Sequence, residues 1–194
     1  MAGGTGNDTY YVDNAADQVF EAAGGGTDNV YTSANFGLAA GQEVEYLRAY
    51  GAGVTSGLTL TGNELANYLI GGAGNDALNG GAGNDRLNGG SGLDTFVFNT
   101  SIAGGTNVDT IEAFNAAEDT INLDDAFFAG LTPGALNSSQ FALNTATGAG
   151  PQIVYNTASG ALFLDSNGAT AGGATQFAIL SGHPSITASD FWVV

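Results

Sequence analysis

Three aspartates recur nine residues apart in the middle of the chain, each behind a run of glycines. Asp76, Asp85 and Asp94 lie in the consecutive nonapeptides GGAGNDALN, GGAGNDRLN and GGSGLDTFV. Glycine permits tight turns that expose backbone carbonyls beside the carboxylates, because it adopts conformations that other residues avoid. Carboxylate and carbonyl oxygens are the ligands that calcium prefers. The spacing therefore predicts a calcium site that is repeated along the chain.

The same nonapeptide occurs outside the central block. Residues 3–11, GGTGNDTYY, match it in full, and residues 12–20 keep its register. Two additional residues precede a degenerate copy at 23–31, and a six-residue insertion precedes another at 104–112. Repeats of one fixed length predict a stacked, solenoid-like fold in which each unit contacts its neighbours.

Each unit consists of six turn residues followed by a three-residue strand with one large apolar side chain. Leu60, Leu69, Leu78, Leu87 and Phe96 recur nine apart and are predicted to point into the core. Two units form one coil, so aspartates that are two repeats apart, such as Asp76 and Asp94, are predicted to become neighbours.

These nonapeptides resemble the repeats-in-toxin (RTX) family, the hemolysin-type calcium-binding repeats. The resemblance implies a right-handed parallel β-roll, a β-helix or solenoid, with calcium between stacked loops. It implies that each ion takes the second and fourth carbonyls and the aspartate of one loop. The loop two repeats later supplies its first and third carbonyls and its aspartate.

Carried onto this sequence, the resemblance implies four ligand sets, and hence several calcium ions. They are Gly72, Gly74 and Asp76 with Gly89, Ser91 and Asp94; Asn63, Leu65 and Asn67 with Gly80, Ala82 and Asp85; Gly81, Gly83 and Asp85 with Gly104, Thr106 and Asp109; and Gly4, Gly6 and Asp8 with Ala23, Gly25 and Asp28. Asn67 offers a neutral oxygen, so weaker binding is predicted there. The third set requires the insertion at 98–103 to loop out.

The predicted fold class is all-β, with four segments. They are N-terminal RTX-like repeats at 1–31, interposed β-strands at 32–61, the central parallel β-roll at 62–121, and a C-terminal all-β cap or small sandwich at 122–194. The last segment contains the strand-like runs QFAL, QIVY, ALFL, TQFAIL and DFWVV, separated by turn residues.

Composition restricts the partners. The chain has 19 acidic residues, 2 basic residues and a net charge of -17, which makes nucleic acid and anionic membranes poor partners. It has no cysteine, so disulfides and thiolate metal sites are excluded. No apolar run approaches the roughly 18 residues of a membrane span.

The sequence predicts no enzyme activity. The single histidine, His183, lies beside a proline and lacks the partners of a zinc site or a catalytic triad. Asp165 and Asn167 lie on a glycine turn, where they could either bind a further calcium or simply close a hairpin.

Bound calcium is predicted to be necessary for folding. Two carboxylates about 4 Å apart repel each other by roughly 4 kcal/mol at an effective dielectric constant near 20. One Leu per unit contributes roughly 1.5 to 3 kcal/mol, against about 1 to 2 kcal/mol of backbone entropy for every residue ordered. Without calcium, residues 62–112 are therefore predicted to be largely disordered.

The resemblance also implies a function. RTX exoproteins carry an uncleaved C-terminal signal for type I secretion machinery, and the ending DFWVV fits that description. The leading hypothesis is a calcium-dependent folding and secretion module, the C-terminal part of a larger extracellular or cell-surface protein. The alternative is an adhesin or carbohydrate-binding module that binds extracellular polysaccharide through Tyr10, Tyr11, Tyr31, Tyr46 and Tyr50. A matrix or surface-layer piece that assembles with calcium is a further alternative.

Overall fold

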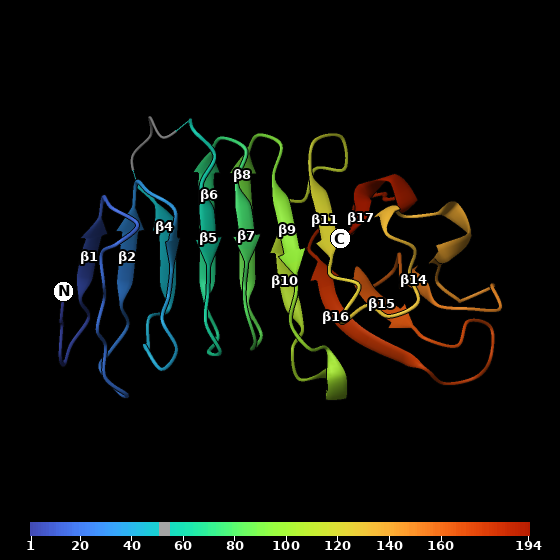
Figure 1. Cartoon of the computed structure of the whole chain (residues 1–194), viewed down its shortest axis with the longest axis horizontal. Helices are drawn as coiled ribbons and strands as arrows, with labels where there is room; N and C mark the ends of the chain where they lie inside the picture. The colour runs from blue at the N-terminus through green and yellow to red at the C-terminus, as the bar shows by residue number, and fades with distance from the viewer. Residues whose placement is uncertain (51–54) are drawn as a thin grey trace.

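The chain folds as an elongated parallel β-roll (Figure 1). The computed structural model describes residues 1–50 and 55–194. Successive coils stack from the N-terminus toward the C-terminal region, and each central coil gives one strand to each of two facing sheets. Helix in the described residues is confined to three short 3-10 turns, η1 (Ala103–Gly105), η2 (Ser138–Gln140) and η3 (Ala188–Asp190).

The larger sheet has ten strands. In spatial order they are β1 (Thr9–Val12), β2 (Asn29–Thr32), β4 (Tyr46–Ala49), β6 (Tyr68–Ala73), β8 (Arg86–Ser91), β10 (Asp109–Glu112), β16 (Ala174–Leu180), β15 (Ala161–Asp165), β14 (Gln152–Tyr155) and β13 (Phe141–Leu143). All pairs from β1 to β16 are parallel, whereas β16, β15 and β14 pair antiparallel.

The smaller sheet has seven strands. In spatial order they are β12 (Gly134–Ala135), β17 (Phe191–Val193), β11 (Thr120–Leu123), β9 (Thr95–Phe98), β7 (Ala77–Asn79), β5 (Thr59–Thr61) and β3 (Phe36–Gly37). Every pair from β17 to β3 is parallel.

The register confirms the predicted coil of two nonapeptides. Leu69 pairs with Leu87 in the larger sheet, and Leu60 pairs with Leu78 in the smaller one. These four side chains and Phe96 have no exposed surface. The core is therefore a ladder of large apolar residues between the two sheets, as the nine-residue spacing predicts.

The segment predicted as interposed strands supplies β3, β4 and β5, which pair within the same two sheets as the glycine-rich coils. Tyr46 pairs with Tyr68 and Leu47 with Leu69. Residues 51–54 of that segment lie outside the described residues. The coil through β3 and β4 thus keeps the strand geometry of the roll without its glycine-aspartate code.

All five strand-like runs predicted near the C-terminus form strands, β13 to β17. Two of them extend the roll itself, because β16 pairs parallel with β10 and β17 pairs parallel with β11. Phe191 and Val193 of β17 are buried, while Trp192 between them is exposed. The C-terminal region is therefore continuous with both sheets.

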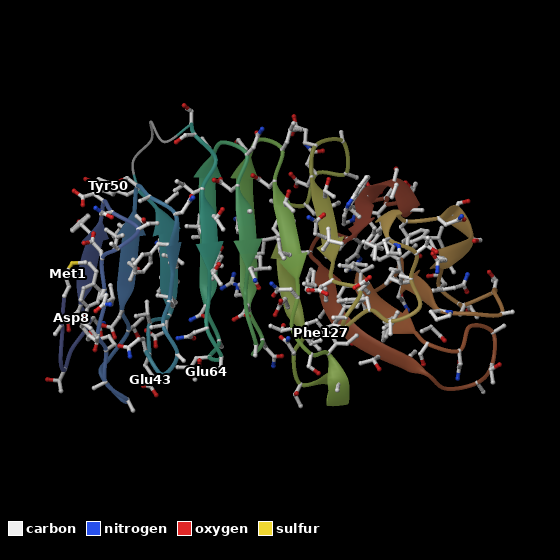
Figure 2. The ribbon with its side chains drawn as sticks, viewed as in Figure 1. Met1, Asp8, Glu43, Tyr50, Glu64 and Phe127 are labelled. Carbon is white, nitrogen blue, oxygen red and sulfur yellow. The ribbon has the colours of Figure 1, made fainter. Side chains whose placement is uncertain are left out.

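Two rows of loops connect the sheets. We call the loops that lead into the larger sheet, including residues 21–28, 38–45, 62–67 and 80–85, the lower edge, and those that leave it, including 74–76, 92–94 and 113–119, the upper edge. Figure 2 places Asp8, Glu43 and Glu64 along the lower edge. Each edge thus collects acidic residues from successive coils.

None of the helices in the described part of the chain has the length and apolarity needed to cross a bilayer.

Candidate metal centre

At the upper edge, aspartates of successive coils form a hydrogen-bonded row. The backbone N–H of Leu58 donates to Oδ1 of Asp76 at 2.7 Å, and the N–H of Asp76 donates to Oδ1 of Asp94 at 2.9 Å. The N–H of Asp94 donates in turn to Oδ1 of Asp119 at 3.0 Å. Each carboxylate is therefore held against the backbone of the preceding coil.

The lower edge repeats this arrangement. The N–H of Asp8 donates to Oδ1 of Asp28 at 2.7 Å, and the N–H of Asp85 donates to Oδ1 of Asp109 at 3.0 Å. Between them, the N–H of Asn67 donates to Oδ1 of Asp85 at 2.7 Å. Aspartates one coil apart are thus neighbours on both edges.

The second oxygen of these carboxylates has no partner. In the described residues, Oδ2 is buried and without a hydrogen bond in Asp8, Asp28, Asp76, Asp85 and Asp94. Asp76, Asp85 and Asp94 are each only 1% exposed. Burying a carboxylate oxygen without a donor or a cation is costly. A row of such oxygens between stacked loops is a donor set that fits calcium.

The structure brings the first predicted ligand set together. A Cβ built on Gly71 would clash with Oδ2 of Asp76 and with the carbonyl oxygen of Gly89, which shows that these two oxygens converge. Gly72 and Gly74 have φ angles of +95° and +134°, where other residues are strained. The N–H of Gly74 donates to the carbonyl of Ser91 at 2.9 Å. Asp94 completes the pair of carboxylates.

The second set has the same geometry with a neutral oxygen. A Cβ on Gly62 would clash with the carbonyl of Gly80 and with Oδ1 of Asn67. Two of its oxygens are already engaged: Oδ1 of Asn67 accepts from the N–H of Asn63 at 2.9 Å, and the carbonyl of Asn63 accepts from the N–H of Ala82 at 3.0 Å. The carbonyl of Leu65 lies against Gly83 of the next loop. Asp85 is the only charged ligand in this set.

In the third set, the insertion does not simply loop out. The β8–β10 register is kept, but the Ile102 side chain is buried and Gly104 and Thr106 are exposed. The carbonyl of Gly81 accepts from Oγ1 of Thr100 at 2.6 Å and from Nδ2 of Asn107 at 3.4 Å. Thr100 of the insertion and Asn107 of the following repeat therefore occupy the Gly81 carbonyl oxygen, which the resemblance implied as a calcium ligand, while Asp85 and Asp109 still meet.

The structure assembles the fourth set only in part, and the two additional residues, 21–22, lie between its two loops. Thr9 pairs with Asn29, and the N–H of Gly6 donates to the carbonyl of Gly25 at 2.5 Å. The Gly4 carbonyl lies 3.1 Å from a Cβ built on Gly25, whereas Ala23 is exposed. A residue that sequence reasoning missed joins this set: carboxylate oxygens of Asp8, Glu21 and Asp28 lie within 4.8 Å of one another.

Another contact that the sequence did not predict joins the coil of β4 to the next coil. Nδ2 of Asn67 donates to the carbonyl of Val44 at 2.7 Å, and Nδ2 of Asn63 donates to the carbonyls of Ala39 and Gln42 at 3.0 and 2.8 Å. The side-chain amides provide hydrogen-bond donors for these carbonyl groups. The contact between these two coils is therefore made by hydrogen bonds and needs no cation.

Comparison with protein families identifies the repeat to which these loops belong. The model of the RTX calcium-binding nonapeptide repeat, in 4 copies, matches residues 61–96. The chain carries RTX repeats. A comparison with curated proteins gave no match.

Among solved structures, the chain is similar to the AlgE6R3 subunit of the Azotobacter vinelandii mannuronan C5-epimerase. The identity is 22% and the TM-score 0.38, over 97% of this chain and 79% of the other. The RTX repeats and the unpartnered carboxylate oxygens together make the protein a calcium-binding β-roll with several sites.

Burial changes the acidity of the RTX aspartates when no cation is bound. Desolvation raises the pKa of Asp85 to about 8, that of Asp109 to about 7 and that of Asp94 to about 6. The charge of Asp109 raises the pKa of Asp85 further, and backbone hydrogen bonds oppose the rise. Desolvation also raises the pKa values of Asp76 and Asp119. The folded roll thus favours neutral carboxyl groups unless a cation balances them.

A pH dependence follows for the calcium-free chain. These pKa values lie above the ordinary aspartate value of 3.8, so the folded state binds more protons than the unfolded state between pH 3.8 and about 8. Stability is therefore greatest below pH 3.8 and is lost as the pH rises to about 8, by about 1.4 kcal/mol per pH unit for each proton of difference. Circular dichroism of calcium-free chain across this range should show β-structure increasing toward acid pH.

The same experiment in calcium provides the control. Protons compete with the ion for the carboxylates, so the apparent calcium affinity should fall as the pH is lowered. A calcium-free spectrum that is constant across the range would contradict the predicted proton uptake.

The remaining candidate residues, Asp165, Asn167 and His183, lie in or beside turns of the C-terminal region. At the turn between β15 and β16, Oδ1 of Asp165 accepts from the N–H of Asn167 at 3.1 Å, while Oδ1 of Asn167 is buried and has no hydrogen-bond partner among the described residues. His183 is exposed in a turn with a φ angle of +51°.

Proposed function

We propose that this RTX chain is a folding and secretion module, which stays unfolded where calcium is scarce and folds on binding calcium outside the cell. The observation that carries the proposal is the row of buried carboxylate oxygens without partners. Because the sites are made of residues from two coils, they exist only in the folded chain. Calcium binding then contributes directly to the free energy of folding.

The position of the C-terminal strand supports the secretion part of the proposal. Phe191 pairs with Ile121 and Val193 with Leu123, and both C-terminal side chains are 1% exposed. A recognition signal in this strand would be accessible in the unfolded chain and covered in the folded one. Calcium outside the cell would then both fold the module and prevent the chain from returning.

Export can be tested with the full chain. Co-expression with a type I exporter should place the chain in the medium, and omission of the exporter should retain it in the cells. Replacement of Phe191 and Val193 by Asp should reduce export, while Trp192→Ala, which changes an exposed side chain of the same strand, is the control. Equal export with and without the exporter would exclude the secretion role.

A second function, polysaccharide binding, is favoured by the outer face of the larger sheet. The rings of Tyr11, Tyr31 and Tyr50 form a cluster, with centroids 5.2 to 6.1 Å apart. Beside them, Arg48 lies over the ring of Tyr46 at 4.2 Å and Arg86 over the ring of Tyr68 at 4.3 Å. These are the only two basic residues of the chain. The face therefore combines exposed aromatic rings, on which sugars stack, with both arginines, of which Arg86 is paired with Glu112.

One tyrosine predicted for this face does not belong to it. Tyr10 is buried, and its hydroxyl donates to Glu21. Side chains alternate along β1, so that of its two tyrosines only Tyr11 points outward. Tyr68, which was not predicted for this face, lies on it because β6 pairs with β4 and places Tyr68 beside Tyr46.

Affinity electrophoresis in calcium tests this second function. Gels containing a polysaccharide should retard the chain, and Tyr31→Ala should reduce the retardation. Trp192→Ala is a matched control, since it removes an exposed aromatic ring from the opposite sheet. Equal loss in both variants, or no retardation by any neutral or acidic polysaccharide, would exclude a binding role for the face.

A further inference from the structure

The first RTX site differs from the others in charge. Asp8, Glu21 and Asp28 present three carboxylates with oxygens within 4.8 Å of one another. Asp28 has no exposed surface and Glu21 is only 6% exposed. The one salt bridge in the described residues joins Arg86 to Glu112, on other strands, so no such pair neutralises this cluster.

Comparison with the central loops shows which ligand Glu21 replaces. At Gly71, a built Cβ would clash with Oδ2 of Asp76 and with the carbonyl of Gly89, the first residue of the next loop. At Gly62, the clash is with the side-chain oxygen of the same loop and again with the first carbonyl of the next loop, that of Gly80.

At Gly3, the equivalent Cβ would clash with Oδ2 of Asp8 and with Oε1 of Glu21. The side-chain oxygen of the same loop is unchanged, but a glutamate oxygen stands where the central loops place a backbone carbonyl.

The two inserted residues explain the replacement. Glu21 and Ala22 are the additional pair between the units at 12–20 and 23–31. The N–H of Glu21 donates to Oε1 of Gln42 at 2.6 Å, which ties the insertion to the next coil. Its carboxylate then points back toward Asp8, and it accepts hydrogen bonds from the Tyr10 hydroxyl at Oε1 and from the N–H of Ala22 at Oε2.

Two oxygens of the cluster point to a cation. Oδ2 of Asp8 and Oδ2 of Asp28 are buried and have no hydrogen-bond partner, while Oδ1 of Asp28 accepts from the N–H of Asp8. The carbonyl of Gly4 lies close by, 3.1 Å from a Cβ built on Gly25. Charged and neutral oxygens are therefore close together between the first two loops.

We infer that Asp8, Glu21 and Asp28 form a three-carboxylate calcium site that binds more tightly than the two-carboxylate site of Asp76 and Asp94. This inference rests on the calcium-dependent function proposed above. Affinity of oxygen sites rises with the number of charged ligands. A trivalent lanthanide, which has a similar preference for charged oxygens, should occupy the same site first.

Terbium luminescence excited through tyrosine tests the site, because Tyr10 contacts Glu21 directly. Titration of the calcium-free chain with terbium should produce emission at the lowest metal concentrations. Glu21→Gln, which removes one charge and keeps the shape, should weaken the tightest site by about tenfold in calcium calorimetry. Asp13→Asn removes an equal charge from an exposed position of the same coil and should leave that site unchanged.

A second variant keeps the inference testable if Glu21→Gln does not fold. Tyr10→Phe retains all three carboxylates, so calorimetry should still show the tight site, while the terbium emission should fall several-fold. Unchanged emission in Tyr10→Phe, or unchanged affinity in a folded Glu21→Gln chain, would overturn the inference. Absence of any calcium binding to the wild-type chain would instead refute the proposed function.

Discussion

Removing calcium is expected to unfold the central RTX coils, residues 62–112. Far-ultraviolet circular dichroism should show a large loss of β-structure in excess chelator and its recovery when calcium is restored in excess. The physical reason is that Asp76 and Asp94 are buried with unpartnered oxygens on adjacent loops. Without a cation, a pair of carboxylates about 4 Å apart costs roughly 4 kcal/mol at an effective dielectric constant near 20.

The loss of β-structure on calcium removal should differ between parts of the chain. Hydrogen exchange should show least protection at the glycine loops 71–76 and 89–94 when calcium is absent. The C-terminal strands β14, β15 and β16 pair antiparallel around buried Tyr155 and Phe177 and hold no carboxylate row, so they should keep more protection. Full β-content in chelator at neutral pH would contradict the account of calcium as the cross-link between coils.

Magnesium provides a control for general ionic strength. It requires a smaller, near-octahedral set of oxygens and keeps its own waters, so it should not restore the roll at the same concentration as calcium.

Asp76→Asn is expected to abolish one calcium site and to destabilise the calcium-loaded chain by about 3 kcal/mol, the size of effect seen when one partner of a buried charged contact is lost. Asparagine keeps an acceptor for the N–H of Leu58, which donates to Oδ1 of Asp76 in the wild type. The loss should therefore report on the ion and not on that hydrogen bond. Calorimetry should show one site fewer, and denaturant unfolding in calcium should show the lower stability.

The destabilisation caused by Asp76→Asn should disappear, or become a stabilisation, when calcium is absent. In chelator, the substitution removes an uncompensated buried charge, so the Asp76→Asn chain should keep at least as much β-structure as the wild type. Asp125→Asn, at an exposed position, should change neither the stoichiometry nor the stability by more than about 0.5 kcal/mol. Equal destabilisation of Asp76→Asn with and without calcium would assign the residue a structural role only.

The sequence was sufficient to predict the parallel roll because its apolar ladder and its glycine code share one period. Leu60, Leu69 and Leu78 predict the core whether or not an aspartate precedes them, and all three are buried. The strand run 46–49 lacked that code, so its membership of the larger sheet became visible only through its pairing with β2 on one side and with Tyr68 and Leu69 of β6 on the other.

The sequence did not predict the contacts that side chains of one coil make with the loops of a neighbouring coil. Glu21 lies in an insertion without a repeat position, and its role depends on the backbone turning it toward Asp8. The amides of Asn63 and Asn67 donate to carbonyls of the preceding coil. Similarly, Thr100 reaches Gly81 only because the insertion before Asn107 packs inward. Such contacts depend on the three-dimensional path of a loop, which periodicity does not specify.

In the central block, strands pair with strands two nonapeptides away, and this spacing limits the steps in which the block can change in length. Gly72 pairs with Gly90 and Leu78 with Phe96, so both sheets advance by the same step of two nonapeptides. Deleting residues 71–88 would join equivalent points and shorten the rod by one rung. Deleting a single nonapeptide would send every later strand into the opposite sheet and interchange the two rows of loops. Whole coils of the central block can therefore be added or lost only as pairs of nonapeptides, whereas insertions such as 21–22 and 98–103 lengthen a loop without adding a coil.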